Sequence, residues 1–137
     1  MAEYIAVERQ TVNVGENVLF DEATIHGGRY IIHRPGSGIF HLRGTGQCKS
    51  RYRISFGGNI TGATAGTEVA LSVSAEGEPM LASQMIYTPA TGNALGNVSD
   101  TTFVEVPSGV SYTVTVRNTG TTALDVVDAN LIIEKVM

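Results

Sequence analysis

Three histidines are the residues in this chain best suited to metal binding or to general acid and base chemistry. His33 and His41 flank a Pro-Gly-Ser-Gly turn. A four-residue loop pairs Arg34 with Ile39, and because side chains alternate along strands this pairing places the two histidines on opposite faces. Two histidines without a third ligand or a nearby carboxylate make a poor zinc site. His26 lies beside two glycines and is expected in a loop, so we expect no metal and no cofactor.

Cys48 is the only cysteine, which excludes an intrachain disulfide and a disulfide-stapled secreted scaffold. Its neighbours Lys49 and Arg51 favour a thiolate, but no histidine lies next to it in sequence to act as a base. Residues 34–38 lack the spacing of a nucleophile elbow, and residues 44–49 do not form a P-loop. A small cupin-type enzyme would need clustered histidines and a glutamate, which the sequence does not offer. We therefore expect a protein that is not an enzyme and a thiol with no catalytic role.

The charge distribution is the strongest clue to a partner. Between residues 29 and 53 the chain has six basic residues and no acidic one, which leaves three basic and 13 acidic residues elsewhere, about +6 against −10. The six candidates for docking a partner are Arg29, Arg34, Arg43, Lys49, Arg51 and Arg53. They could dock an acidic capsid surface, pair with acidic faces of adjacent subunits, or form solvated ion pairs across their own sheet.

Nucleic acid and membranes are not expected partners. Arg51 and Arg53 flank Tyr52, but strand alternation sends the two arginines to the face opposite the ring. The sequence pI is about 5.2, which disfavours phosphate binding. No stretch approaches the roughly 20 apolar residues of a membrane span, and the first residues lack the apolar region of a signal peptide. We expect synthesis in a cytosol.

Short strands follow one another along the whole chain with turn residues between them. The expected strands are residues 4–9, 17–20, 30–34, 39–43, 51–56, 69–74, 80–88, 102–106, 112–117 and the terminal segment. Residues 57–67 and 89–100 are the expected long loops, and no segment has a helix signal. With 16 glycines and only 16% charged residues, the pattern predicts one all-β domain over residues 1–137, an antiparallel sandwich of about eight to ten strands.

The last 15 residues (ALDVVDANLIIEKVM) are interpreted as a strand pair that is apolar on both faces. Leu131 and Ile133 share one face, and Ile132 and Val136 share the other. One face is expected to meet the subunit's own core and the other a second surface. These four residues are the predicted trimer interface; the alternative is a strand enclosed within a single large domain.

The carboxyl-terminal third also resembles a known family. Residues 103–120 (FVEVPSGVSYTVTVRNTG) and 128–136 (DANLIIEKV) are similar to the last strands of the C1q/TNF-like jelly roll, in particular its bacterial and phage branch, which includes the terminal domain of collagen-like spore-surface glycoproteins. The resemblance implies a ten-stranded antiparallel jelly roll that assembles as a homotrimer, with its final strand near the threefold axis. This sequence lacks the Gly-X-Y repeats of the spore members, which disfavours a stalked surface fibre.

A trimer without a stalk fits a virion component, so the resemblance implies a capsid decoration protein of a tailed phage. The expected partners are two further copies of the chain and the major capsid protein, and the expected location is the virion after synthesis in the host cytoplasm. The alternative is a receptor- or carbohydrate-binding module of a tail fibre or a bacterial surface or spore, with loops 57–67 and 89–100 forming the site.

Overall fold

The computed structural model describes residues 1–46 and 48–137. Within these residues the chain forms twelve strands and one short 3-10 helix. The strands are β1 (Ala2–Ala6), β2 (Gln10–Val12), β3 (Glu22–Ile25), β4 (Ile31–His33), β5 (Phe40–Arg43), β6 (Lys49–Thr61), β7 (Val69–Ala75), β8 (Glu78–Pro79), β9 (Met85–Tyr87), β10 (Gly96–Pro107), β11 (Ser111–Asn118) and β12 (Leu124–Lys135), and the helix is η1 (Leu81–Ser83). The prediction of an all-β protein is confirmed.

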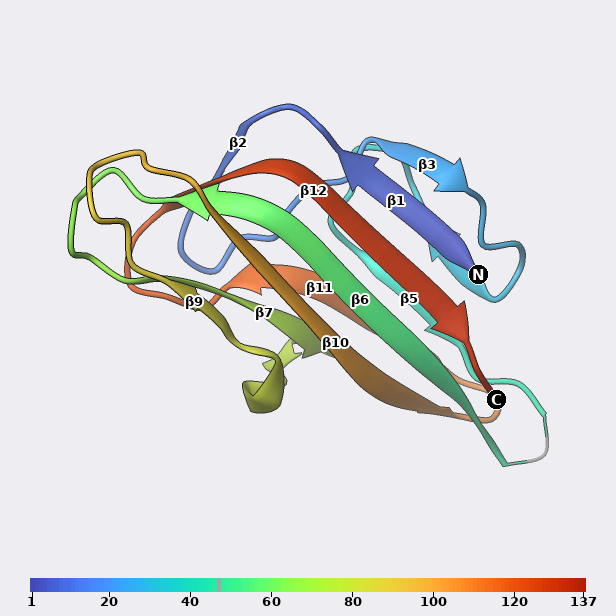
Figure 1. Ribbon diagram of the computed structural model, residues 1–137. Coiled ribbons are helices and arrows are strands. Elements are labelled where there is room, and N and C mark those ends of the chain that lie inside the picture. Colours follow the sequence, from blue (N-terminus) through green and yellow to red (C-terminus); the bar gives the residue numbers. More distant parts are fainter. Residues whose placement is uncertain (47) are drawn as a thin grey trace.

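The strands form two antiparallel sheets that pack face to face (Figure 1). Sheet A has the order β10-β6-β12-β1-β3, and β2 also pairs with β12. Sheet B has the order β4-β5-β11-β7-β8, and β9 also pairs with β7. Figure 1 shows β6, β10 and β12 as long strands of sheet A, with both chain termini toward the same end of the molecule. The predicted antiparallel sandwich is therefore present.

Side-chain alternation explains which face of each strand is buried. On β6, Tyr52, Ile54 and Phe56 point into the space between the sheets and are at most 2% exposed. On β12, Leu131 and Ile133 join the same core and are fully buried. Burying such side chains contributes about 1.5–3 kcal/mol each, so the alternation of these two strands fixes which face of sheet A is left outside.

The β4–β5 hairpin forms with the predicted register. His33 pairs with Phe40, and Ile32 pairs with His41. His33 therefore stacks on the Phe40 ring at 4.4 Å between centroids, while His41 is exposed on the other face. The turn uses Gly36 at φ +87°, a left-handed conformation that glycine adopts without steric cost. The separation of the two histidines is confirmed.

Several expected boundaries were wrong. Residues 57–61 belong to β6 and residues 96–100 belong to β10, so both expected loops are shorter than predicted. Residues 80–88 hold η1 and the short β9 instead of one strand, and residues 17–20 contribute only an isolated bridge between Asn17 and Arg117. The terminal segment is a single strand, β12, whose register shifts between Val127 and Asn130, and not a strand pair. In the described part of the chain, no helix is long and apolar enough to span a membrane.

Candidate assembly face

Three of the four residues predicted to form a trimer interface lie on two different faces of β12, and Val136 follows the strand. Leu131 and Ile133 are fully buried in the subunit's own core, so a second chain cannot touch them without disrupting the sandwich. Ile132 lies on the outer face of sheet A, partly exposed, and Val136 is 43% exposed just beyond the strand. The surface left for assembly is therefore the outer face of sheet A, to which Ile132 belongs.

Cross-strand register brings small and uncharged side chains together in the middle of this outer face. Ile132 pairs with Ser55 on β6, and Ser55 pairs with Thr101 on β10. In the next row, Asn130 pairs with Gly57, which pairs with Ser99. We call these six residues (Ser55, Gly57, Ser99, Thr101, Asn130 and Ile132) the central floor. Sheet faces in contact with water usually carry charged side chains, and this floor carries none.

Gly57 has no packing reason to be a glycine within its own subunit. An added Cβ would meet nothing within 4 Å. Its neighbour Gly58 differs, since a Cβ there would lie 3.3 Å from the Phe56 ring and 3.4 Å from the Ala129 backbone. Glycine inside a strand weakens it and marks a bulge or a site where another backbone approaches closely. The β12 bulge lies beside Gly57. The geometry of one subunit therefore fits a glycine that serves the bulge and equally a glycine that lets another backbone approach.

Phe103 is the large apolar side chain that borders the central floor on the edge strand β10. It pairs with Arg53 in register and is 52% exposed. Together with Ile5 and Ile132 it gives this face apolar groups on both sides of the small residues. The sequence contained a signal for it, because Val104 and Val106 are buried on β10 and alternation places Phe103 on the opposite face. Sequence reasoning did not identify Phe103 or Gly57 as interface residues.

A hydrogen-bonded carboxylate lies beside this floor on β1. The Thr24 hydroxyl donates to Glu3 Oε1 at 2.6 Å, and the Asn130 amide donates to Glu3 Oε2 at 2.6 Å. These two donors lower the pKa of Glu3 below its usual value. The Glu3 side chain is thereby held in one position as an ionised group.

Ion pairs occupy one end of the same face and involve three of the six predicted docking residues. Lys49 Nζ lies 3.1 Å from Glu105 Oε1, and Arg51 Nη2 lies 2.8 Å from Glu105 Oε2. Arg53 pairs with Glu134. Donation from Arg51 and then Lys49 lowers the pKa of Glu105. For these three residues, the expectation of ion pairs across the subunit's own sheet matches the geometry.

The other three docking candidates separate into two places. Arg34 lies exposed in the β4–β5 turn. Arg29 and Arg43 lie beside Tyr30, because Arg29 Nη2 donates to the Tyr30 hydroxyl at 3.1 Å and the Arg43 backbone N–H donates to the Tyr30 carbonyl at 2.9 Å. Lys135 joins them, with its ammonium 5.4 Å from the centroid of the Tyr30 ring. Sequence reasoning missed Lys135, because it follows Glu134 in an apolar strand.

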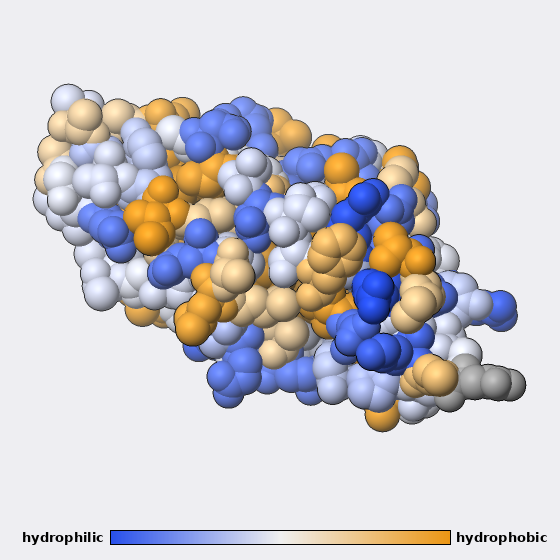
Figure 2. All heavy atoms as spheres, turned by 60° about the horizontal axis from the view of Figure 1, so that its bottom comes forward, coloured by the Kyte–Doolittle hydropathy of each residue, from blue (hydrophilic) through white to orange (hydrophobic). Residues whose placement is uncertain are grey.

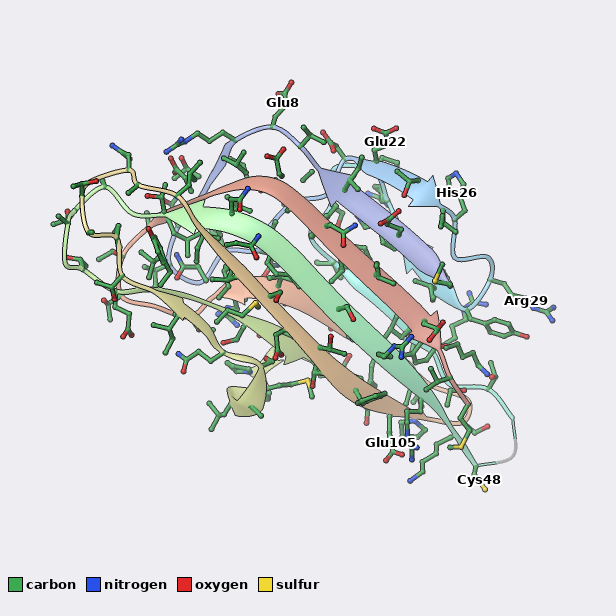
Figure 3. All side chains as sticks on the ribbon, viewed as in Figure 1. Glu8, Glu22, His26, Arg29, Cys48 and Glu105 are labelled. Carbon is green, nitrogen blue, oxygen red and sulfur yellow. The ribbon has the colours of Figure 1, made fainter. Side chains whose placement is uncertain are left out.

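The structure brings no metal-binding group of side chains together among the residues it describes. His33 Nε2 lies 2.7 Å from the Ser37 carbonyl oxygen and the ring is used in packing. No group of three or more His, Cys, Asp or Glu side chains with metal-binding geometry occurs in residues 1–46 and 48–137. Cys48 is exposed at the end that carries Glu105, as Figure 3 shows. The hollow lined by Tyr4, His26, His33 and Pro35 has a volume of about 370 Å³ and opens to solvent.

Comparison with known proteins identifies the fold. No family model matches the sequence, and no curated protein matches it either. Among solved structures, the globular domain of zebrafish complement 1qA matches with a TM-score of 0.64 at 12% identity, covering 96% of this chain and 94% of that one. Murine APRIL matches with a TM-score of 0.65 at 15% identity, covering 97% and 98%. Eiger TNF from S. frugiperda matches with a TM-score of 0.65 at 13% identity, covering 99% and 91%. The chain has a C1q/TNF-like jelly-roll fold.

Proposed function

We propose that this chain is a non-enzymatic structural subunit that assembles as a homotrimer through the outer face of sheet A and decorates the capsid of a tailed phage. The observation that carries the assembly is the central floor, in which Gly57 keeps an open space that its own subunit does not use. The C1q/TNF-like fold supports the trimer, because the resemblance described above implies threefold assembly for this family.

The geometry of the face favours contact with a second copy of the chain. Small residues let another backbone approach, and Phe103 and Ile132 supply apolar surface on either side. Their burial against a partner is favourable by about 25 cal/mol for each Å² of apolar area removed from water. The ion pairs of Glu105 and Glu134 lie at the margin, where polar groups surround the apolar centre of an ordinary interface.

The capsid role rests on the charge division of the chain together with the resemblance to phage proteins. A decoration subunit joins neighbouring capsid proteins and needs a partner-binding surface in addition to its trimer face. In this proposal the subunit is made in the host cytoplasm and resides in the virion. Its main partner besides itself is the major capsid protein.

Cosedimentation with expanded heads of the phage that carries the gene tests this function. Purified protein added to heads that lack it should pellet with them and reach a saturating occupancy. Heads already decorated with unlabelled protein serve as the control and should take up none of the added chain. Absence of pelleting at micromolar concentration, together with binding to a glycan array, would replace capsid decoration with the carbohydrate-binding alternative.

A further inference from the structure

Two cations that have no counter-ion in the described part of the chain lie beside the Tyr30 ring. The Arg29 guanidinium carbon is 5.2 Å from the Tyr30 ring centroid, and Lys135 Nζ is 5.4 Å from it. The four ion pairs found among the described residues involve neither cation. Because both cations lie near the same ring, an anionic group that binds there is attracted by both.

The backbone around Tyr30 is firmly anchored. Its carbonyl accepts the Arg43 backbone N–H at 2.9 Å. The fully buried Tyr52 donates its hydroxyl to the Arg43 carbonyl, and burial raises the pKa of this phenol. Arg43 itself is exposed. The backbone of Tyr30 is therefore fixed at one end of the sandwich, with the Arg29 and Lys135 cations beside its ring.

This end carries most of the positive charge of the molecule. Its basic side chains are Arg29, Arg43, Lys49, Arg51, Arg53 and Lys135, and its acidic ones are Glu105 and Glu134. Six of the nine basic and two of the 13 acidic residues of the chain thus lie here, which gives +4 at this end and −8 over the remainder. Glu3 is the next carboxylate along sheet A, opposite Ile132 in register. Figure 3 shows Arg29, Cys48 and Glu105 at this end and Glu8 and Glu22 at the opposite upper edge.

Figure 2 adds a view of one face coloured by hydropathy, which does not distinguish the sign of a charge. Its most hydrophilic atoms gather toward the end that carries the C-terminus, while hydrophobic and hydrophilic atoms alternate over the rest of the face. A surface of one sign that is concentrated at one end steers a partner of the opposite sign to that end.

We infer that the end centred on Tyr30 is the docking surface for a carboxylate-rich protein surface, with Arg29 and Lys135 as its free cations. Arginine and lysine both pair with carboxylates, and the Arg29 fork offers several donors. This inference rests on the proposed role of the chain as a subunit that docks on another protein, and it identifies the end and the chemistry of that contact.

Nucleic acid fits this end less well than an acidic protein. Base binding uses an exposed aromatic face for stacking, and the Tyr30 ring is half-buried with two cations beside it. A nucleic acid longer than the basic end would also contact the rest of the molecule, whose side chains carry a net charge of −8. A compact cluster of carboxylates avoids that repulsion.

A charge-matched binding experiment tests the inference. Fluorescein-labelled hexaglutamate is titrated with the assembled protein at low salt, and binding is followed by fluorescence anisotropy. R29Q/K135Q should weaken binding about tenfold, an effect that added salt reduces. The control R9Q/R34Q removes the same net charge from cations outside this end and should stay within about twofold of wild type.

Each outcome decides between the alternatives. Equal weakening by both double variants would show that net charge alone matters and would overturn the inference. Tighter binding of a labelled hexathymidylate than of hexaglutamate would replace the protein partner with nucleic acid. Light scattering on the same samples separates this inference from the proposed function. If the protein is a trimer but the two double variants bind hexaglutamate equally, only the assignment of the docking end is overturned. If the protein is a monomer and the difference between the variants remains, only the proposed assembly is overturned.

Discussion

Adjacent residues on β12 have opposite roles in this account. Ile133 is fully buried between the sheets, while Ile132 lies on the outer face beside Ser55. Alternation alone predicted this difference from the sequence. Alternation could not show which of the two apolar faces of β12 is buried inside the subunit. Only the packing of sheet B over the face with Leu131 and Ile133 makes these two residues unavailable to a partner.

The pair Ile133→Asp and Ile132→Asp separates folding from assembly. Ile133→Asp buries an unpaired carboxylate and should cost several kcal/mol, leaving little folded protein. Ile132→Asp should keep the fold, with a urea midpoint lowered only modestly by the like charge of Glu3 opposite it, while greatly reducing trimer formation. Circular dichroism during urea unfolding and native mass measurement check the two effects. A folded Ile132→Asp protein that assembles like wild type would exclude this face as the interface.

Glu105 makes a small contribution to stability that depends on pH. Because folding lowers its pKa, ionised Glu105 stabilises the fold above the ordinary carboxyl pKa of about 4.3, and this contribution is lost as pH falls through the lower folded value. Its ion pairs are exposed, so the effect should be modest and should shrink in high salt.

Glu105→Gln should therefore lose less stability than wild type between pH 7 and pH 3, as measured by urea unfolding at both values. Glu68→Gln provides the control, because Glu68 is exposed and none of the ion pairs found in the described residues involves it. An unchanged pH dependence in Glu105→Gln would show that the pairs with Lys49 and Arg51 do not form in solution.

Strand pairing decides how far β6 and β10 extend, and sequence reasoning ended β6 too early and began β10 too late. Gly57, Gly58 and Asn59 have low strand propensity, so residues 57–61 were predicted as loop. In the structure they pair with β10 on one side and β12 on the other. Two ladders of hydrogen bonds override the local preference. The central floor was missed for the same reason, since two of its six members, Gly57 and Ser99, lie in segments that were expected to be loops, and its members come together only once the strand order is known.

Gly57 and Gly58 give a matched pair of substitutions at the centre of β6. Gly57→Val should leave the subunit folded or slightly more stable, because valine favours strands and its Cβ meets open space. The same change should weaken or abolish the trimer. Gly58→Val should instead destabilise the subunit, because its Cβ would crowd Phe56 and Ala129.

Thermal unfolding at low concentration and native mass at high concentration distinguish the two variants. If Gly57→Val unfolds as readily as Gly58→Val, the glycine serves the β12 bulge. If Gly57→Val assembles normally, no backbone approaches there. Either result would remove the main support for the interface.

At the scale of the whole molecule, the sandwich arranges two different surfaces. The outer face of sheet A is weakly charged at its centre and carries the proposed contact between copies. The end around Tyr30 is basic, and the remaining surface is acidic. The sequence already showed the charge division, but sequence reasoning treated all six basic residues of the segment as one group of docking candidates. The fold separates them, because register places Lys49, Arg51 and Arg53 beside Glu105 and Glu134, while Arg29 lies with Lys135 at the Tyr30 ring.

The mass of the native particle in solution tests the central claim most directly. Size-exclusion chromatography with multi-angle light scattering at micromolar concentration should give three times the 14.5 kDa mass of one chain. A Gly57→Val sample measured in the same buffer should shift toward the mass of one chain while remaining folded. A wild-type mass of one chain at this concentration would contradict the account.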